Sequence, residues 1–261
     1  MFFAYAHPRN CMTSLLSVAL TCGLTTAGLG CGTLTGEVRI VEVTERLELK
    51  LEDGRLLRLA GLDAPAPDLA LDKLAADWTD RPLRLALLAP NPDRWGRWLA
   101  DLAKPDGASL TDDLIRAGAL RVKPEMETRN CEEPRLVAEQ DARRLKAGLW
   151  AEPHAILAAD DTLRLAEADS RMAIIEGEVR RVGERRSRVY LDFGGRDGFT
   201  VVVARKSEAA FRRRGMALPS LARQFVRVRG YLDNRFGLRI ELADPLMIER
   251  IEGVGGSGPG G

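Results

Sequence analysis

Three short stretches of alternating apolar and polar residues follow one another between residues 36 and 62, and they constrain the fold more than any other feature of the chain. They are residues 36–43, 46–51 and 55–62, and Glu52-Asp53-Gly54 predicts a tight turn between the last two. Strands joined this closely pair with one another and bury one face. The sequence therefore predicts a small antiparallel barrel.

The third stretch ends in an acid and a proline. Because Pro65 cannot continue a strand ladder, we expect Asp63 at the strand's exit, with Arg58 in the body of the same strand. A guanidinium and a carboxylate on one rigid element are common in sites that handle anions. Most strands with one arginine and one terminal acid have no chemical role, so the rest of the chain must decide.

The following residues complete this barrel and predict a second one. Apolar spacing gives helices at 68–78, 109–117 and 132–147 and further strands at 83–88 and 98–102, which together describe an OB-type barrel with helices, a fold that often handles oligonucleotides. The second half predicts strands at 174–182, 188–193, 198–204, 225–232, 238–242 and 246–251, with a helix at 207–214.

The predicted fold class is α+β, with two OB-type barrels, the second OB-like. The predicted order is an export segment at 1–35, a first barrel at 36–152, a connector at 153–169, a basic second barrel at 170–252 and a flexible Gly-rich tail at 253–261.

Charge divides unevenly between the halves. Residues 170–252 hold 18 Arg and Lys against 11 Asp and Glu, a net of +7, so the total of +1 leaves −6 for residues 1–169. A basic half favours a polyanionic partner, and arginines scattered over a solvated face would give the same count.

The amino-terminal segment predicts export. Arg9 precedes a stretch from Cys11 to Gly32 without any charged residue, and no second long apolar segment follows, so we expect a cleaved signal or one amino-terminal anchor and no other transmembrane segment. The location would be periplasmic, envelope-associated or secreted, and Cys31 is a weak candidate for lipid attachment. Because only Cys131 lies clearly in the mature body, we expect no disulfide framework and no Cys-based metal cluster.

Three separated pieces carry a family resemblance. They are Arg58-Leu-Ala-Gly-Leu-Asp63-Ala-Pro65, Asp93-Arg-Trp-Gly-Arg97 with the helix after it, and Ala138-Glu-Gln-Asp-Ala-Arg-Arg-Leu-Lys-Ala-Gly-Leu-Trp150. In this order they resemble the staphylococcal nuclease family, also called thermonuclease-like or TNase-like, over residues 36–152. The resemblance implies calcium-assisted hydrolysis of phosphodiesters in DNA or RNA.

Within that resemblance, Arg58 and Arg97 match the two catalytic arginines that contact phosphate, and Asp63 matches one calcium ligand. Glu45 could replace a second ligand, whereas another ligand position is Val43. The glutamate that activates water corresponds to Ala66, which cannot accept a proton.

Two alternatives concern individual residues of this site. Asp68 could substitute for the missing base, although it fits better as an acid in the first turn of a helix. Arg58 could simply pair with Glu45 or Asp63 on the barrel surface.

Arginines and aromatics also alternate on the strands predicted in the second half. Arg180, Arg188, Tyr190, Arg227 and Arg229 are candidates for binding single-stranded DNA or RNA by backbone contact and stacking. The neighbouring Phe193, Phe199 and Tyr231 fit either this use or the barrel core.

The preferred interpretation is an exported thermonuclease-like protein that binds nucleic acid or another phosphate polyanion, with weak or lost hydrolysis and a weakened calcium site. The alternatives are an active calcium-dependent nuclease and a non-enzymatic interaction module of the envelope. The sequence does not indicate the oligomeric state.

Overall fold

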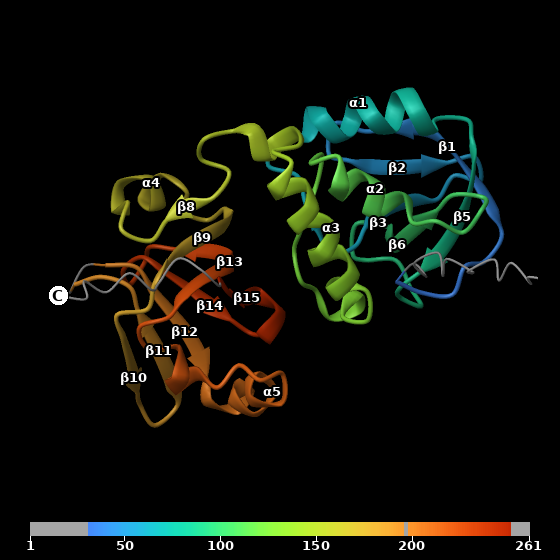
Figure 1. Cartoon of the computed structure of the whole chain (residues 1–261). Coiled ribbons are helices and arrows are strands. Elements are labelled where there is room, and N and C mark those ends of the chain that lie inside the picture. Colours follow the sequence, from blue (N-terminus) through green and yellow to red (C-terminus); the bar gives the residue numbers. More distant parts are fainter. Residues whose placement is uncertain (1–30, 196–197, 252–261) are drawn as a thin grey trace, which may run out of the picture.

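The computed structural model describes residues 31–195 and 198–251, which form two main β-sheets with helices beside them (Figure 1). Residues 31–152 are called the first unit below, and residues 153–251 the second unit. The chain is therefore a mixed α+β protein, as predicted. The predicted tail and all but the last five residues of the predicted export segment lie outside the described residues.

Five strands of the first unit close into a ring in the order β1-β2-β3-β6-β5. Four ladders are antiparallel and the β3–β6 ladder is parallel, because strands in a ring with an odd number of members cannot alternate in direction throughout. Buried Ile40, Leu49, Leu57 and Leu85 fill the interior. The strands are β1 (Glu37–Val43), β2 (Glu48–Leu51), β3 (Leu56–Leu59), β5 (Pro82–Leu87) and β6 (Arg97–Ala103).

The predicted strand at 55–62 is interrupted by a turn. β3 ends at Leu59, and Gly61 has a φ of +70°, a left-handed conformation that glycine adopts readily because it has no Cβ. A Cβ at Gly61 would also lie 2.6 Å from the hydroxyl of Thr128. The backbone therefore leaves the ring at this glycine.

Beyond the turn, the chain forms a separate two-stranded ladder. β4 (Leu62–Asp63) pairs antiparallel with β7 (Arg121–Val122), and Asp63 lies opposite Arg121. The expectation that one rigid strand carries both Arg58 and Asp63 is therefore wrong, since Gly61 separates their two strands.

Three helices of the first unit lie beside the ring (Figure 1). α2 starts at Ser109, whose hydroxyl accepts a hydrogen bond from the Asp112 amide, whereas α1 starts after Ala66 without a side-chain cap. The helices are α1 (Pro67–Trp78), α2 (Leu110–Arg116) and α3 (Glu132–Arg144). Short 3₁₀ turns are η1 (Met126–Thr128), η2 (Gly148–Ala151), η3 (Arg205–Ser207), η4 (Leu218–Leu221) and η5 (Pro245–Met247).

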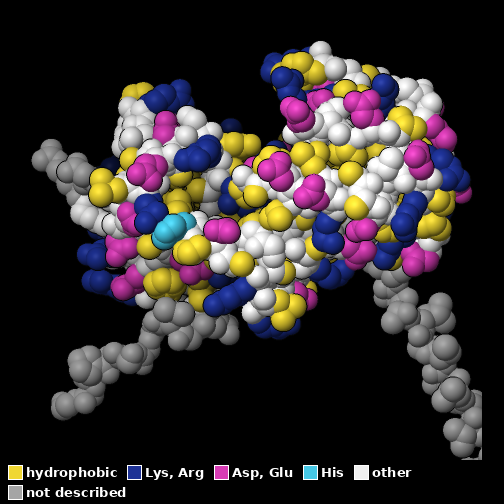
Figure 2. Space-filling view, turned by 90° about the horizontal axis from the view of Figure 1, so that it is seen from above, with side chains coloured by type: hydrophobic (Ala, Val, Ile, Leu, Met, Phe, Trp, Pro, Cys, Tyr) yellow, Lys and Arg dark blue, Asp and Glu magenta, His cyan; other side chains and the backbone are white. Residues whose placement is uncertain are grey.

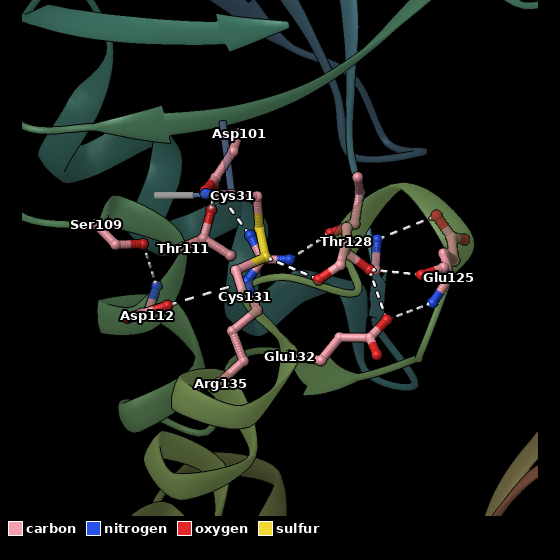
Figure 3. The surroundings of a disulfide bond; sticks show 12 residues. Cys31, Asp101, Ser109, Thr111, Asp112, Glu125, Thr128, Cys131, Glu132 and Arg135 are labelled. Atoms are coloured by element: carbon pink, nitrogen blue, oxygen red, sulfur yellow. Dashed lines mark hydrogen bonds and ion pairs between the residues drawn. A yellow bond between two sulfur atoms is a disulfide. The ribbon is translucent and has the colours of Figure 1, made fainter. Parts of the chain in front are cut away.

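A disulfide joins Cys31 to Cys131, the residue before α3 (Figure 3). The backbone amide of Cys31 also donates to buried Asp101, which accepts a hydrogen bond from Thr111 and forms an ion pair with Arg135 of α3. The prediction that there is no disulfide is wrong, because Cys31 is bonded to Cys131.

The second unit contains one eight-stranded sheet in the order β10-β11-β12-β14-β13-β9-β8, with β15 also paired to β13. Within the described residues β10 and β8 stand at the two ends of this path, so the predicted second closed barrel is not confirmed. The elements are β8 (Leu157–Ala158), α4 (Thr162–Glu167), β9 (Met172–Glu178), β10 (Arg181–Glu184), β11 (Arg188–Asp192), β12 (Thr200–Ala204), α5 (Glu208–Arg213), β13 (Phe225–Asp233), β14 (Arg239–Leu242) and β15 (Ile248–Arg250).

The two units meet through α3 and the segment after it. Trp150 is buried and packs with Leu149 and with Ile174 of β9 in a small apolar cluster. The predicted connector contains β8, which is the end strand of the second sheet, and α4 beside it (Figure 1). Among the described residues, no helix is both long enough and apolar enough to span a bilayer.

Candidate functional site

Arg58 of β3 forms a two-pronged ion pair with Glu125, with both nitrogen–oxygen distances at 3.2 Å. Glu125 also accepts from the Gly61 amide at 3.1 Å and lies 2.7 Å from the Lys123 ammonium. Burial alone would raise the pKa of the Glu125 carboxyl, but the hydrogen bonds and charges of Arg58 and Lys123 outweigh it and lower that pKa. A carboxylate inside the protein therefore occupies the guanidinium fork predicted to hold phosphate.

Hydrogen bonds to Glu132, at the start of α3, position the loop that carries Glu125 (Figure 3). One carboxylate oxygen of Glu132 accepts from the Glu125 amide at 2.7 Å and from the Thr128 hydroxyl at 2.8 Å. Glu132 directly follows Cys131, whose sulfur is bonded to Cys31. The position of Glu125 thus depends on a short chain of contacts that ends at the disulfide.

Arg97, at the start of β6, has two acidic partners of its own. Its guanidinium lies 2.8 Å from Asp93 and 3.0 Å from Glu48, and it is within 4.8 Å of the exposed Trp95 ring. The hydrogen bonds from Arg97 lower the pKa of Asp93 to about 2. Arg58 and Arg97 therefore lie on neighbouring strands but are directed at different carboxylates.

Arg58 lines an open cavity of about 370 Å³ at the end of the ring. Arg46, Lys123, Glu45 and Asp63 also line it, so three cationic side chains face two carboxylates. The structure thus brings Arg58, Asp63 and Glu45 together, as the sequence predicted, but Arg97 is not part of the described lining. The floor is apolar: Leu47, Leu59, Leu62, Leu74 and Leu120.

Asp63 is engaged by Arg121, whose Nε donates to it at 2.6 Å. Arg121 also donates to the carbonyl of Met172 in the second unit. A cation would have to compete with this guanidinium for the Asp63 carboxylate. The sequence signal for Arg121 was weak, because its pairing depends on the ladder that begins after Gly61.

A calcium ion does not fit the residues on this surface. Ca²⁺ takes six to eight oxygen ligands, whereas Glu45 lies on an exposed turn and Asp63 is paired with Arg121. Among the described residues, no group of three or more acids, histidines or cysteines is arranged to hold a metal. Ala66 directly precedes α1, and exposed Asp68 lies in its first turn outside the described cavity lining, which gives no support to Asp68 as a replacement base.

The five candidates in the second unit lie in different environments. Arg180 and Arg188 are exposed, and Tyr190 is half-buried beside a surface hollow between β11, β12 and β14. In contrast, Arg227 lies 2.6 Å from Glu176, and Arg229 is only 1% exposed. On the face shown in Figure 2, Lys and Arg side chains lie among Asp and Glu and form no single basic patch.

Arg229 belongs to a buried ion-pair network between the units. Its guanidinium lies 2.9 Å from Glu139 of α3 and 2.7 Å from Glu249, and Arg143 pairs with both acids. Burial alone would lower the pKa of Arg229, but the two carboxylates raise it. The expectation that Arg229 contacts nucleic acid is therefore corrected: its charge is neutralised inside the protein, where a polynucleotide cannot reach it.

Sequence reasoning missed Glu125 and Lys123 because both fall in a polar segment without periodicity. The one feature of the sequence that could have indicated them is the charged pair in Lys123-Pro124-Glu125, directly after the residues of β7. His154 lines a second hollow that also includes Asp63 and Arg121.

Comparison with known proteins reveals a distant relationship. No family model matches the chain. An uncharacterized endonuclease of Escherichia coli O157:H7 and one of Escherichia coli are each 29% identical to it over 126 residues, covering 44% of this chain and 76% of each relative. This distant homology agrees with a nuclease-like origin.

Proposed function

We propose that this chain is a thermonuclease-like protein whose first unit binds a phosphate group of nucleic acid or another polyanion without metal-assisted hydrolysis. The observation that carries the proposal is the cavity that Arg58, Lys123 and Arg46 line above an apolar floor. Support comes from the three motifs, from the closed five-stranded ring and from the distant relationship to endonucleases.

A bound phosphate would replace the Glu125 carboxylate as the anionic partner of Arg58 and Lys123. Arg58 and Lys123 both pair with Glu125, and a phosphate oxygen can replace a carboxylate oxygen in either contact. The guanidinium fork suits phosphate geometry, and the ammonium supplies a second charge beside it. Glu125 then acts as an internal competitor that neutralises part of the positive charge of the resting site.

Hydrolysis lacks two of its usual contributors. No carboxylate stands at residue 66 to take a proton from water, and loss of a general base typically reduces rates by about 10²- to 10⁴-fold. Arg121 holds Asp63, which leaves Glu45 as the remaining acid of the cavity. These residues can bind and neutralise a phosphate, and none of them occupies the position of the water-activating glutamate.

Export and the role of the second unit are further parts of this proposal. The Cys31–Cys131 disulfide supports an oxidising compartment outside the cytoplasm, with any signal removed before Cys31. We assign the first ring to an OB-type barrel of the staphylococcal nuclease kind, and the second unit to an OB-like module. We include Arg180, Arg188 and Tyr190 in a nucleic-acid surface, since they are not buried.

An active nuclease is the second candidate, and the name of the Escherichia coli relatives favours it. The two candidates separate in one assay: incubation of the whole chain with labelled single-stranded DNA and RNA, with calcium and with chelator. We expect binding without cleavage in both conditions. Cleavage that requires calcium and is lost in Arg97→Ala would overturn the binding proposal.

The anion exchange has a direct test with a matched control. Glu125→Gln removes the competing charge, and we expect affinity for a labelled oligonucleotide to rise about fivefold, or ~1 kcal/mol, the interaction of two unit charges about 4 Å apart in a water-like medium. Glu127→Gln removes the same charge from an exposed position two residues away and should change affinity much less. Arg58→Ala should weaken binding by about tenfold or more. Equal effects of the two glutamine variants would refute exchange at Arg58.

A further inference from the structure

Two hollows that adjoin the phosphate cavity share one tyrosine in their lining. The phosphate cavity shares Asp63 with a hollow of about 570 Å³ between the two units, and it shares Lys123 with a smaller one of about 180 Å³. Both of these hollows are lined by Tyr231 and Met172 of the second unit. Tyr231 therefore borders both of the hollows that adjoin the cavity of Arg58 and Lys123.

The position of Tyr231 follows from the alternation of strand β13. Arg227, Arg229 and Tyr231 lie on one face of the strand, because side chains two residues apart point the same way. Acidic partners engage the first two, but Tyr231 is 57% exposed. On this face of β13, Arg227 and Arg229 are therefore held in ion pairs, whereas the ring of Tyr231 is open to solvent beside the hollows that adjoin the phosphate cavity.

The other aromatic residues predicted on these strands are used differently. Phe193 and Phe199 are buried, with ring centroids 5.2 Å apart, and belong to the core of the second unit. Phe236 is 78% exposed, but it lines another hollow, with Tyr190 and Arg239. Of these rings, Tyr231 is the one that borders both hollows adjoining the phosphate cavity.

Cationic side chains accompany Tyr231 in the larger hollow. Arg171 is exposed, and its guanidinium donates to the backbone carbonyl of Glu167, which leaves its charge available to an anion. Arg164 is exposed and paired only with the solvent-facing Asp161, a contact of small energy. An aromatic face beside exposed guanidinium groups suits single-stranded nucleic acid, since a base stacks while its phosphates are neutralised.

We propose that Tyr231 is a stacking platform for a base adjacent to the phosphate held by Arg58 and Lys123, and that Arg171 contacts the next phosphate. The ligand class is single-stranded nucleic acid, because a duplex keeps its base faces inside the stack. This inference rests on the proposed phosphate site and extends it across the junction, so that both units contribute to one binding surface.

The test measures fluorescence anisotropy of a labelled 12-nucleotide single strand of DNA or RNA, and of the matching duplex, with the whole chain in chelator. Stacking contributes about 1–3 kcal/mol per base, so Tyr231→Ala should weaken single-strand binding by about 5- to 150-fold. Tyr231→Phe keeps the ring and should recover most of that affinity, whereas Tyr231→Leu keeps bulk without an aromatic face and should not. Tyr231→Ala should also remove the preference for single strands over duplex.

Two further variants make the outcomes distinct. Leu145→Ala removes an exposed apolar side chain that lines none of these three hollows, and we expect it to change affinity less than twofold. Arg171→Ala should reduce the slope of log affinity against log salt by about one. Weaker binding in Arg58→Ala with unchanged binding in Tyr231→Ala would overturn this inference and leave the phosphate site standing. Unchanged binding in Arg58→Ala, or no binding by the unaltered chain, would overturn both.

Discussion

Removing Glu139 should destabilise the whole protein, because this side chain joins the two units from inside. Its carboxylate is fully buried and accepts hydrogen bonds from the Val122 amide, from Arg229 and from Arg143. Glu139→Ala would leave Arg229 with one acidic partner, Glu249, at 2.7 Å. Breaking a buried pair by deleting one member typically costs 3–5 kcal/mol.

We expect a loss of about 3 kcal/mol in the free energy of unfolding, at the lower end of that range, since Glu249 still neutralises part of the Arg229 charge. For a chain of this size the loss corresponds to a fall in melting temperature of roughly 6–12 °C. Urea denaturation, monitored by circular dichroism, measures the loss in the free energy of unfolding. The contacts across the junction also predict that both units unfold in one transition.

The matched control is Arg181→Ala. Arg181 pairs with Asp192 at 2.8 Å, but its side chain is 76% exposed, so its loss should cost less than about 0.5 kcal/mol. Combining Glu139→Leu with Arg229→Met should recover at least half of the stability, because apolar side chains fill the site without an unpaired charge. A loss below about 1 kcal/mol in Glu139→Ala, or separate transitions for the two units, would refute this account of the junction.

Three other predictions concern the first unit. Cys131→Ser opens a disulfide between residues 100 apart in sequence, and should lower the free energy of unfolding by about 2–4 kcal/mol in oxidising buffer but not in reductant, as measured by urea denaturation. Gly61→Ala should cost more than about 1 kcal/mol, since φ is +70° and the new Cβ would meet Thr128; a smaller thermal shift than Gly54→Ala, where nothing is close, would contradict this. The contribution of Glu125 should be complete above its ordinary pKa of 4.5 and disappear as pH falls through its lowered folded value, so Glu125→Gln should flatten the acid limb of a stability–pH curve; an unaltered limb would argue against the Arg58 pair.

Local pattern predicted the elements of the first unit well. The alternation of Val38, Ile40, Leu49 and Leu57 is the period of a half-buried strand, and these residues are the interior of the ring. The apolar spacing around Leu74 likewise predicted α1. Such patterns suffice because burial of one face decides the secondary structure.

The partners of the site residues could not be predicted in the same way. Arg58 meets Glu125 across 67 positions of sequence, and Arg229 meets Glu139 across 90, so neither contact has a local signature. The turn at Gly61 moved Asp63 onto another ladder, where Arg121 neutralises it. Alternation alone made Arg227 and Arg229 binding candidates and left Tyr231 between a binding and a core role, although acidic partners engage both arginines and Tyr231 is the exposed residue.

The disulfide also determines how the first unit responds to mechanical force. Tension applied between Cys31 and any residue beyond Cys131 passes through the sulfur–sulfur bond, and the 99 residues between the two cysteines form a covalently closed loop outside that path. The five-stranded ring and the loop that carries Glu125 both lie within the closed loop. A pull that would separate β1 from β5 in the reduced protein therefore leaves the ring of the oxidised protein unloaded, and the cavity around Arg58 keeps its shape under tension.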